Sequence, residues 1–221
     1  MSEVIEIPSY NDNLETLIGE LGKLLPHDKL AVFNNDAAQL AKKFPSPLKL
    51  VRGDKAPLFS LPNALGKTIN TENVLKQGPM VLTFYRGVWC PYCNLQLKNL
   101  QQILPLIREA GANLVAVSPM TPDHSFTMKE TNALQFEVLS DVGNAVASQF
   151  TTVFKNDALP IQAMKELGYD FFSFYDDDSA ELPVPATFVI AQDRTIRLAY
   201  SGGGDYRQRV EPKDILDVLG D

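Results

Sequence analysis

The N-terminal part of the chain repeats apolar residues at the spacing of amphipathic helices. Between residues 11 and 44 they recur every three or four positions, and the polar residues at 11–13 are N-cap candidates. Pro26 divides this pattern and Pro45 ends it, which predicts two helices. Each helix has one apolar face that must be buried against the rest of the chain or against a second subunit. We therefore predict a helical extension over residues 1–50 that serves as a packing layer, with a homodimer or a peptide-binding groove as the alternatives.

From about Ala56 the pattern changes to short apolar runs that alternate with helical segments. The predicted elements, in chain order, are a hairpin over 58–69, a buried strand over 80–85, a helix over 91–110 that Pro105 breaks, a strand over 112–118, a helix over 123–132, a strand over 136–139, a helix over 142–150, a strand pair over 186–190 and 195–200, and a helix over 212–219. Residues 151–182 show no clear pattern beyond a short helix within 159–167. The alternation predicts a mixed sheet with helices on both faces. The fold class is therefore α/β, in a domain that spans residues 51–221.

Composition and charge narrow the class of protein. Of the 221 residues, 45% are hydrophobic and 21% are charged, which is ordinary for a globular chain. The net charge of −7 disfavours contact with nucleic-acid phosphates and with anionic lipids. No apolar run reaches the ~18 residues of a membrane span, and the N-terminus lacks the pattern of a signal peptide. We therefore expect a soluble cytoplasmic protein that binds neither nucleic acid nor a membrane.

The two cysteines of the chain stand together as Cys90-Pro91-Tyr92-Cys93, where a predicted central strand passes into a helix. Two cysteines exclude a disulfide-stapled scaffold and a four-cysteine zinc site, whereas Cys-x-x-Cys at such a corner is typical of redox chemistry. Residues i and i+3 share one face of the first helical turn, so the two sulfurs are able to form a disulfide. Cys90 falls at the N-cap, where free N–H groups and the helix dipole stabilise a thiolate. This predicts a lowered pKa for Cys90 and a nucleophilic role for it.

Other candidate groups are weaker. Two ordinary buried cysteines are the alternative to a redox pair, and a metal half-site shared between subunits would need further ligands, for which His27 and His124 have no suitable spacing. We therefore expect no metal and no cofactor. His124 follows a strand end, where it would either assist proton transfer or belong to a solvated loop. The aspartates at 176–178 indicate an acidic loop, and the glycines at 202–204 indicate a flexible turn.

The region from Gly53 to about Leu219, roughly three quarters of the chain, resembles a known family in the stretches 81–87, 115–118, 138–141 and 185–188. The family is that of the peroxiredoxin-like alkyl hydroperoxide reductase/thiol-specific antioxidant (AhpC/TSA) proteins of the thioredoxin superfamily. The resemblance implies a thioredoxin-like fold and an antioxidant oxidoreductase. In such an enzyme Cys90 and Cys93 would reduce a peroxide, or a protein or small-molecule disulfide, and a thiol donor such as thioredoxin or glutathione would re-reduce them.

The motif also resembles other members of the superfamily. Its Cys-Pro-Tyr-Cys is similar to that of glutaredoxins, and Trp89 before it is similar to thioredoxins. A disulfide reductase without peroxidase activity and a non-catalytic redox sensor are therefore the alternatives to a peroxidase.

Several positions depart from the peroxiredoxin pattern. Peroxiredoxins carry Pro-x-x-x-Thr-x-x-Cys around the peroxide-attacking cysteine. In that alignment Cys93 is the attacking residue, while Arg86 and Cys90 replace the proline and the threonine. The arginine that the family places before its Ala-Thr-Phe strand is replaced by Pro185. This proline resembles the cis-proline of thioredoxins, so the resemblance predicts a cis Val184–Pro185 bond beside the cysteines.

The residues of the predicted site come from the local sequence and from the family resemblance. Cys90 and Cys93 are the catalytic residues, and helix geometry favours Cys90 as the attacker on disulfides. The family alignment favours Cys93 for peroxide, but Cys93 lacks the arginine and threonine of that pattern, so Cys90 is slightly favoured for peroxide as well. Arg86 would either stabilise a thiolate or pair with a surface acid. Thioredoxins bury an acid beneath the disulfide, and Thr83 or Phe84 at that position cannot titrate, so proton transfer is left to water or to an unidentified group. The predicted substrate-binding residues are Trp89, Arg86, Val184 and Pro185.

Overall fold

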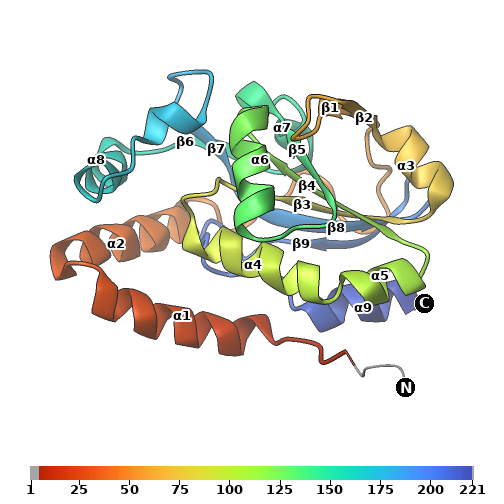
Figure 1. Cartoon of the computed structure of the whole chain (residues 1–221), viewed down its shortest axis with the longest axis horizontal. Coiled ribbons are helices and arrows are strands. Elements are labelled where there is room, and N and C mark those ends of the chain that lie inside the picture. Colours follow the sequence, from red (N-terminus) through yellow and green to blue (C-terminus); the bar gives the residue numbers. More distant parts are fainter. Residues whose placement is uncertain (1–4, 221) are drawn as a thin grey trace.

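A five-stranded mixed sheet lies at the centre of the fold (Figure 1). The computed structural model describes residues 5–220, and the five strands are β3 Met80–Phe84, β4 Asn113–Ser118, β5 Glu137–Ser140, β8 Ala186–Ile190 and β9 Ile196–Tyr200. Their order in the sheet is β5-β4-β3-β8-β9. The first three run parallel, whereas β8 is antiparallel to β3 and β9 is antiparallel to β8. The predicted mixed sheet is therefore confirmed.

Helices and a short hairpin cover both faces of the sheet. In chain order they are α1 Tyr10–Leu24, α2 His27–Lys43, the hairpin strands β1 Ser60–Pro62 and β2 Thr68–Asn70, α3 Thr71–Gln77, α4 Pro91–Gln102, α5 Leu104–Glu109, α6 Pro122–Thr131, α7 Ala147–Phe150, α8 Ala158–Glu166 and α9 Pro212–Gly220. Successive residues of β3 point to opposite faces. Val81 joins the hydrophobic cluster that contains α4, α5 and α9, and Leu82 joins the cluster that contains α3 and α7. Burial on both faces explains the continuous apolar run of β3.

Two interruptions of helical segments have local causes. α4 and α5 are separate helices with Pro105 in the first turn of α5, which confirms the predicted break. The single helix predicted over 142–150 is wrong. A 3-10 turn at Val142–Asn144 precedes α7, and Gly143 within it has φ = 78°, in the left-handed region that favours glycine. The chain therefore turns sharply before α7 begins.

The segment over residues 151–182 contains a second, smaller sheet. β6 Val153–Lys155 pairs antiparallel with β7 Glu181–Pro183, and α8 and a 3-10 helix at Phe171–Phe174 lie between them in the chain. The sequence predicted a helix where α8 lies but not the two strands. Three-residue strands that pair across a long intervening segment leave too little local alternation to be recognised. This segment is nevertheless important, because it supplies one wall of the candidate site.

The two predicted N-terminal helices are present and pack on the rest of the chain. α1 contacts α4, and α2 contacts α8. Tyr10 and Ala37 are fully buried, in the same hydrophobic cluster as the two cysteines. Figure 1 shows α1 beneath α4, and α2 to the left of α4. Their apolar faces therefore belong to the chain's own core, while a homodimer and a domain boundary near residue 50 stay predictions.

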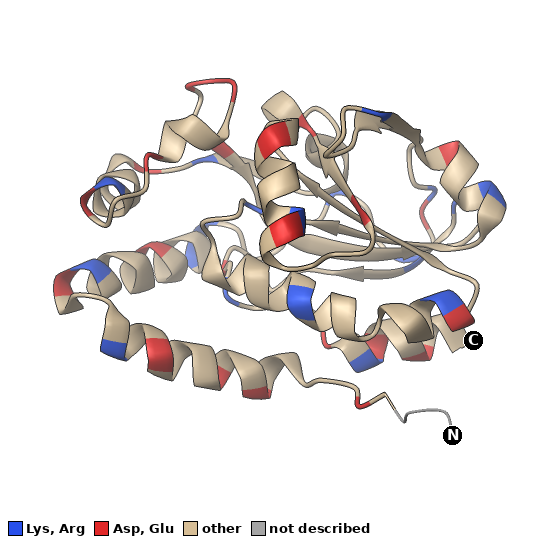
Figure 2. Cartoon of the chain, viewed as in Figure 1, with Lys and Arg blue, Asp and Glu red and all other residues tan. Residues whose placement is uncertain are grey.

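Charged residues lie mainly on helices and loops, with both signs interspersed, and the central strands carry few of them (Figure 2). No helix within residues 5–220 is long and apolar enough to cross a membrane. Some charged residues are buried instead, among them Asp36 and Asp141 and two arginines, Arg86 and Arg209, that are almost completely buried. The two arginines matter for the site. Both lie near the cysteine pair.

Candidate active site

The cysteine motif lies where β3 passes into α4. Cys90 is the N-cap of α4: its backbone is extended (φ −86°, ψ 109°), and its Sγ accepts a hydrogen bond from the Cys93 N–H at 3.4 Å. Pro91 occupies the first turn, where a backbone N–H has no acceptor within the helix, so proline loses no hydrogen bond there. The predicted placement of the motif at the strand-to-helix corner is confirmed.

The two sulfurs are close enough to share a hydrogen bond. Both cysteines are free and buried, and their Sγ atoms are 2.7 Å apart. A disulfide would bring the same atoms to ~2.05 Å. The arrangement is that of a reduced dithiol in which either sulfur is within reach of the other.

A buried arginine that the sequence analysis did not single out contacts Cys93. Arg209 places its Nη2 3.5 Å from the Cys93 Sγ, and its Nε donates to the Gln96 side-chain oxygen at 2.8 Å. Its Nη1 donates to the carbonyl oxygens of Tyr206 and Gln208. Within the described part of the chain, no carboxylate forms a salt bridge with Arg209. The Cys93 sulfur, once ionised, is therefore a natural counter-ion for this guanidinium.

A chain of hydroxyl and amide groups lies at the position where thioredoxins bury an acid. The Gln96 amide donates to Thr83 Oγ1 at 3.2 Å and to Thr187 Oγ1 at 3.1 Å, and the two hydroxyl oxygens are 3.0 Å apart. The two threonines stand opposite each other on β3 and β8. None of these groups titrates, as expected for Thr83, but together they hold the Gln96 oxygen toward Arg209.

The surroundings of the two thiols move their pKa values apart. Burial acts to raise the pKa of Cys93. Several effects together outweigh burial and lower this pKa to about 5: the hydrogen bond with Cys90, the charge of Arg209, and the backbone N–H and charge of Arg86. Burial raises the pKa of Cys90, and the hydrogen bond and negative charge of Cys93 raise it further. The prediction that Cys90 has the lowered pKa is therefore wrong. The N–H at the helix start does reach Cys90, but the hydrogen bond with Cys90 lowers the pKa of Cys93 most, and the guanidinium charge of Arg209 lowers it further.

Arg86 does not pair with a surface acid, which was one of its two expected roles. It is 3% exposed, and no salt bridge in residues 5–220 involves it. Its guanidinium carbon lies 3.9 Å from the ring centroid of Tyr206 and 4.8 Å from that of Trp89, which is the geometry of a cation–π interaction. Its Nε has no hydrogen-bond partner among the described residues. Arg86 therefore adds a second positive charge beside the cysteines.

Trp89 is held by a tyrosine from the segment that the sequence left unassigned. The Trp89 Nε1 donates to Tyr175 Oη at 2.9 Å, and that hydroxyl donates to the Arg86 carbonyl oxygen at 2.9 Å. A Cβ at Gly87 would lie 2.5 Å from the Trp89 Nε1, so glycine is needed at this close approach. Trp89 and Arg86 were thus predicted from the sequence, whereas Tyr175, which holds both in place, was not.

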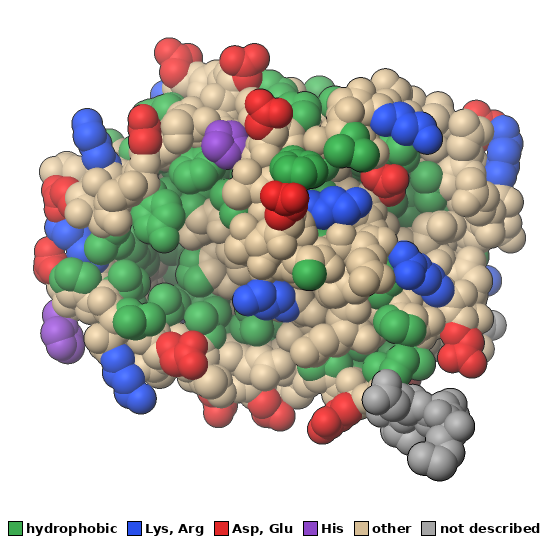
Figure 3. Space-filling view, in the orientation of Figure 1, with side chains coloured by type: hydrophobic (Ala, Val, Ile, Leu, Met, Phe, Trp, Pro, Cys, Tyr) green, Lys and Arg blue, Asp and Glu red, His purple; other side chains and the backbone are tan. Residues whose placement is uncertain are grey.

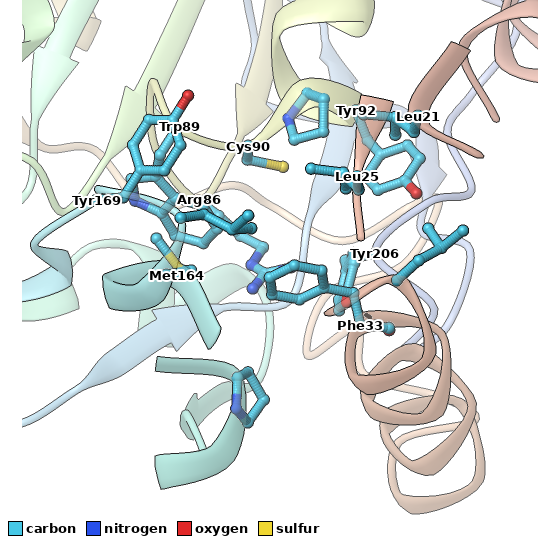
Figure 4. A pocket seen from close by; sticks show the side chains of 14 residues that line it. Leu21, Leu25, Phe33, Arg86, Trp89, Cys90, Tyr92, Met164, Tyr169 and Tyr206 are labelled. Carbon is cyan, nitrogen blue, oxygen red and sulfur yellow. Dashed lines mark hydrogen bonds between the residues drawn. The ribbon is translucent and has the colours of Figure 1, made fainter. Parts of the chain in front are cut away.

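An apolar pocket of about 180 Å³ opens onto Cys90. The N-terminal helices supply one wall with Leu21, Leu25 and Phe33, and Met164 from α8 also lines it. Figure 4 shows the Cys90 sulfur pointing into the space between these side chains. In Figure 3 apolar side chains gather around a hollow on the left of the view, between α8 and the N-terminal helices. The N-terminal packing layer is therefore also a wall of the candidate site.

The pocket distinguishes the two cysteines. Arg86 and Trp89, both predicted to bind substrate, line it together with Cys90 and Tyr206 (Figure 4). Cys93 does not line it. Cys90 therefore faces the pocket, whereas Cys93 faces the interior and Arg209.

The cis-proline prediction is wrong. No cis peptide bond occurs within residues 5–220, so the Val184–Pro185 bond is trans. The chain runs in extended form from β7 to β8: the Val184 N–H donates to the Thr152 carbonyl oxygen at 2.8 Å, and the Thr151 hydroxyl donates to the Val184 carbonyl oxygen at 3.0 Å. Both residues of the bond are buried, and neither lines the pocket. Val184 and Pro185 therefore lack the cis bond and the position in the pocket on which their predicted role in substrate binding depended.

The remaining candidates lie outside the pocket. The His124 Nε2 is 2.8 Å from the Ser173 carbonyl oxygen, and the histidine does not line the pocket. In the part of the chain that the structure describes, no three His, Cys, Asp or Glu side chains are grouped as metal ligands. The glycines at 202–204 are not a loose turn: a Cβ at Gly204 would lie 1.9 Å from the Leu40 carbonyl oxygen. They allow the loop to pack tightly against α2.

Similarity to known proteins supports a family assignment. Residues 52–199 match the model of the AhpC/TSA family. The chain is 34% identical over 106 residues to peroxiredoxin Bcp of Escherichia coli (strain K12), which is 48% of this chain and 65% of that protein. It is 32% identical over 93 residues to a putative peroxiredoxin of Mycobacterium tuberculosis (strain ATCC 25618 / H37Rv), which is 42% of this chain and 59% of that protein. The match thus spans less than two thirds of the length of these relatives.

Solved structures share the fold. Peroxidoxin BcpB from Mycobacterium tuberculosis has a TM-score of 0.61 at 22% identity, over 77% of this chain and 97% of that chain. A PrxQ variant of Xylella fastidiosa has a TM-score of 0.60 at 14% identity, over 76% of this chain and 94% of that chain. These similarities confirm the expected thioredoxin-like architecture of the α/β domain.

Proposed function

This chain belongs to the AhpC/TSA family, and from that premise we propose that it is a thiol-dependent peroxidase. Cys90 and Cys93 would cycle between the dithiol and the disulfide. The observation that carries the proposal is one thiol with a lowered pKa, Cys93, whose sulfur lies 2.7 Å from a second thiol that can capture its oxidised form.

In the first step, the Cys93 thiolate attacks the terminal oxygen of a hydroperoxide. The S–O bond forms while the O–O bond breaks, so the sulfur is oxidised to a sulfenic acid and the peroxide is reduced to an alcohol or water. The departing oxygen takes a proton, for which the Cys90 S–H is the nearest donor beside the attacking sulfur. The positive charges of Arg209 and Arg86 stabilise the thiolate and the charge that develops on the departing oxygen.

In the second step, Cys90 resolves the oxidised cysteine. Its sulfur, now a thiolate, attacks the sulfur of the Cys93 sulfenic acid. The S–S bond forms while the S–O bond breaks, and the departing hydroxide takes a proton from solvent to become water. A thiol donor such as thioredoxin or glutathione then attacks Cys90, because Cys90 lines the pocket and Cys93 does not. Cys93 departs as a thiolate, and its low pKa makes it the better leaving group. A second donor thiol releases Cys90, and the donor ends as a disulfide.

Disulfide reduction is the second candidate, and the pocket at Cys90 favours it. In this reaction Cys90 attacks a substrate disulfide and Cys93 resolves the mixed disulfide. The raised pKa of Cys90 leaves little thiolate to begin that reaction, so peroxide reduction has the stronger support. A redox sensor would form the same disulfide without turnover.

Steady-state assays with excess dithiol separate these three functions. Hydrogen peroxide, an organic hydroperoxide and insulin should be compared side by side. The proposal expects peroxide turnover that Cys93→Ser abolishes, while Cys90→Ser retains one turnover and accumulates a sulfenic acid on Cys93. Turnover of insulin alone would identify a disulfide reductase, and a reversible disulfide without turnover would identify a sensor. The cytoplasmic location expected from the sequence stays a prediction.

A further inference from the structure

The loop over residues 201–211, which carries Arg209, is attached to the start of α1. The Tyr10 hydroxyl donates to the Arg207 carbonyl oxygen at 2.6 Å, and the Tyr10 N–H donates to the Glu211 carboxylate at 2.8 Å. The next N–H of α1 donates to the other carboxylate oxygen at 2.9 Å. These contacts lie two residues before and two residues after Arg209. Because Tyr10 is fully buried, the attachment is part of the core.

α2 holds the same loop at a second place. The Tyr206 hydroxyl donates to the Phe33 carbonyl oxygen at 2.9 Å, and the Gly204 N–H donates to the Phe44 carbonyl oxygen at 2.7 Å. Gly204 approaches α2 so closely that a Cβ there would collide with the Leu40 carbonyl oxygen. Both helices of the N-terminal extension therefore bind the loop.

At its inner end this loop carries the positive charge of Arg209. Among residues 5–220, no carboxylate forms a salt bridge with it. Arg209 is 4% exposed, and burial of a guanidinium is unfavourable unless an anion and hydrogen-bond acceptors face it. The acceptors are Gln96 and two carbonyl oxygens, and the ionisable group within its reach is the Cys93 thiol. The geometry therefore stabilises the thiolate form of Cys93.

We infer that Arg209 is a catalytic residue that stabilises the Cys93 thiolate. The N-terminal helices position it, with Tyr10 and Glu211 as the positioning residues of the loop. The inference rests on the proposed role of Cys93 and assigns a task to the extension beyond packing. Arg209 places a guanidinium at the cysteine pair of this chain, in which Pro185 replaces the arginine expected in the family pattern.

The test follows the ionisation of Cys93 through the ultraviolet absorbance of its thiolate as a function of pH, in the full-length Cys90→Ser chain, where a single thiol remains. Arg209→Met removes the charge and keeps a side chain of similar length, so the midpoint of Cys93 ionisation should rise by on the order of one to two pH units. Arg209→Gln is a second neutral variant with the same expectation, in case the methionine chain does not fold. Arg197→Met, at an exposed arginine on β9, is the matched control and should leave the midpoint unchanged.

Two further variants test the positioning role. Glu211→Gln and Tyr10→Phe weaken the attachment to α1 but retain Arg209, and each should raise the midpoint by part of the shift seen without the arginine. Asp214→Asn, at an exposed acid of α9, is the control for loss of a nearby negative charge. An unchanged midpoint in a folded neutral Arg209 variant would overturn the catalytic role. Unchanged midpoints in both folded attachment variants would overturn the positioning role.

The assay also keeps this inference apart from the proposed function. The titration needs no peroxide, so a raised midpoint in the arginine variants would support the inference even where the unsubstituted chain shows no peroxide turnover. That combination would contradict the peroxidase proposal alone. Peroxide turnover with an unchanged midpoint would contradict the inference alone.

Discussion

The Sγ atom of Cys90 lies 2.7 Å from the Sγ atom of Cys93, yet the two sulfurs have different surroundings. Cys90 lines an apolar pocket of which the N-terminal helices form one wall, whereas Cys93 contacts the guanidinium of Arg209. The two properties that a reactive cysteine needs, access and a lowered pKa, are therefore divided between neighbouring residues. Under the proposed function, this division makes Cys93 the sulfur that is oxidised and Cys90 the sulfur that the reductant meets.

Mild oxidation should convert the pair into an intramolecular disulfide. The two sulfurs are already neighbours in the first turn of α4, so bond formation needs only small side-chain movements. Mass spectrometry of the peptide that contains both cysteines should show the loss of two hydrogens, which a dithiol reverses. The single variants Cys90→Ser and Cys93→Ser should not show this loss. Two thiols that remain open to alkylation after oxidation would contradict the prediction.

The rate of Cys93 oxidation should depend on pH according to its lowered pKa. Because the pKa lies near 5 and the thiolate is the reactive form, the rate should be nearly constant around neutral pH. Below about pH 5 it should fall by about tenfold per pH unit as the sulfur gains a proton. Stopped-flow measurement of sulfenic acid formation in the Cys90→Ser chain, where the serine hydroxyl is still a hydrogen-bond donor, provides the profile. A rate that rises through about pH 8.5, as for an ordinary thiol, would exclude this ionisation.

Tyr175→Phe should destabilise the protein and loosen Trp89. The substitution removes a hydroxyl that accepts from the Trp89 Nε1 and donates to the Arg86 carbonyl oxygen, so two partly buried polar groups lose their partner. The expected loss in the free energy of unfolding is about 1–3 kcal/mol, measured by urea denaturation. Trp89 is the only tryptophan of the chain, so its fluorescence reports directly on the site. Tyr169→Phe, at a half-exposed tyrosine, is the control, and an equal effect in both variants would count against a specific role for Tyr175.

Leu25→Asp should weaken the use of an organic hydroperoxide with a bulky apolar group. Leu25 lines the pocket at Cys90, and the Cys93 sulfur lies 2.7 Å behind the Cys90 sulfur, so a hydroperoxide that reaches Cys93 from this pocket would place its apolar group near Leu25. An aspartate there would remove apolar contact and add negative charge. The KM for such a hydroperoxide should rise roughly tenfold, since burial of one aliphatic side chain is worth about 1.5 kcal/mol. The KM for hydrogen peroxide should change less. Leu24→Asp, at the adjacent residue, which is 77% exposed, is the matched control. Equal changes for the two peroxides would show that the pocket does not select the substrate.

Gly204→Ala should destabilise the loop that carries Arg209. The added Cβ would lie 1.9 Å from the Leu40 carbonyl oxygen, so the loop or α2 would have to move. Urea denaturation should show a loss of about 2 kcal/mol or more in the free energy of unfolding. Gly22→Ala, in α1, has open space around the new Cβ and should instead stabilise by about 0.5–1 kcal/mol, because alanine favours the helix. A Gly204→Ala protein as stable as the parent would contradict the close packing of loop and helix.

Much of the fold follows from local patterns. The apolar spacing in the first fifty residues predicted two helices, and Pro26 and Pro105 marked real helix boundaries. The buried run of β3 and the position of the cysteine motif after it were also predicted correctly. The single helix over 142–150 failed because the φ angle of Gly143 overrides the helical spacing around it. The failure of the cis-proline prediction has a different cause, since a resemblance to another family says little about a backbone bond that neighbouring strands hold in extended form.

The sequence by itself determined the α/β class, the N-terminal helices and the presence of a cysteine pair at the start of α4, because each depends on residues within one turn or one strand of each other. The tertiary structure alone decided which sulfur has the lowered pKa. Arg209 is 116 residues away from Cys93 in the chain, and Tyr175 is 86 residues away from Trp89, so no local spacing marks either contact. The helix start acts on Cys90 through one N–H, whereas folding brings a full, buried guanidinium charge to Cys93. Such a charge acts strongly on the pKa of a neighbouring thiol in a site shielded from water, and only the folded chain brings it there.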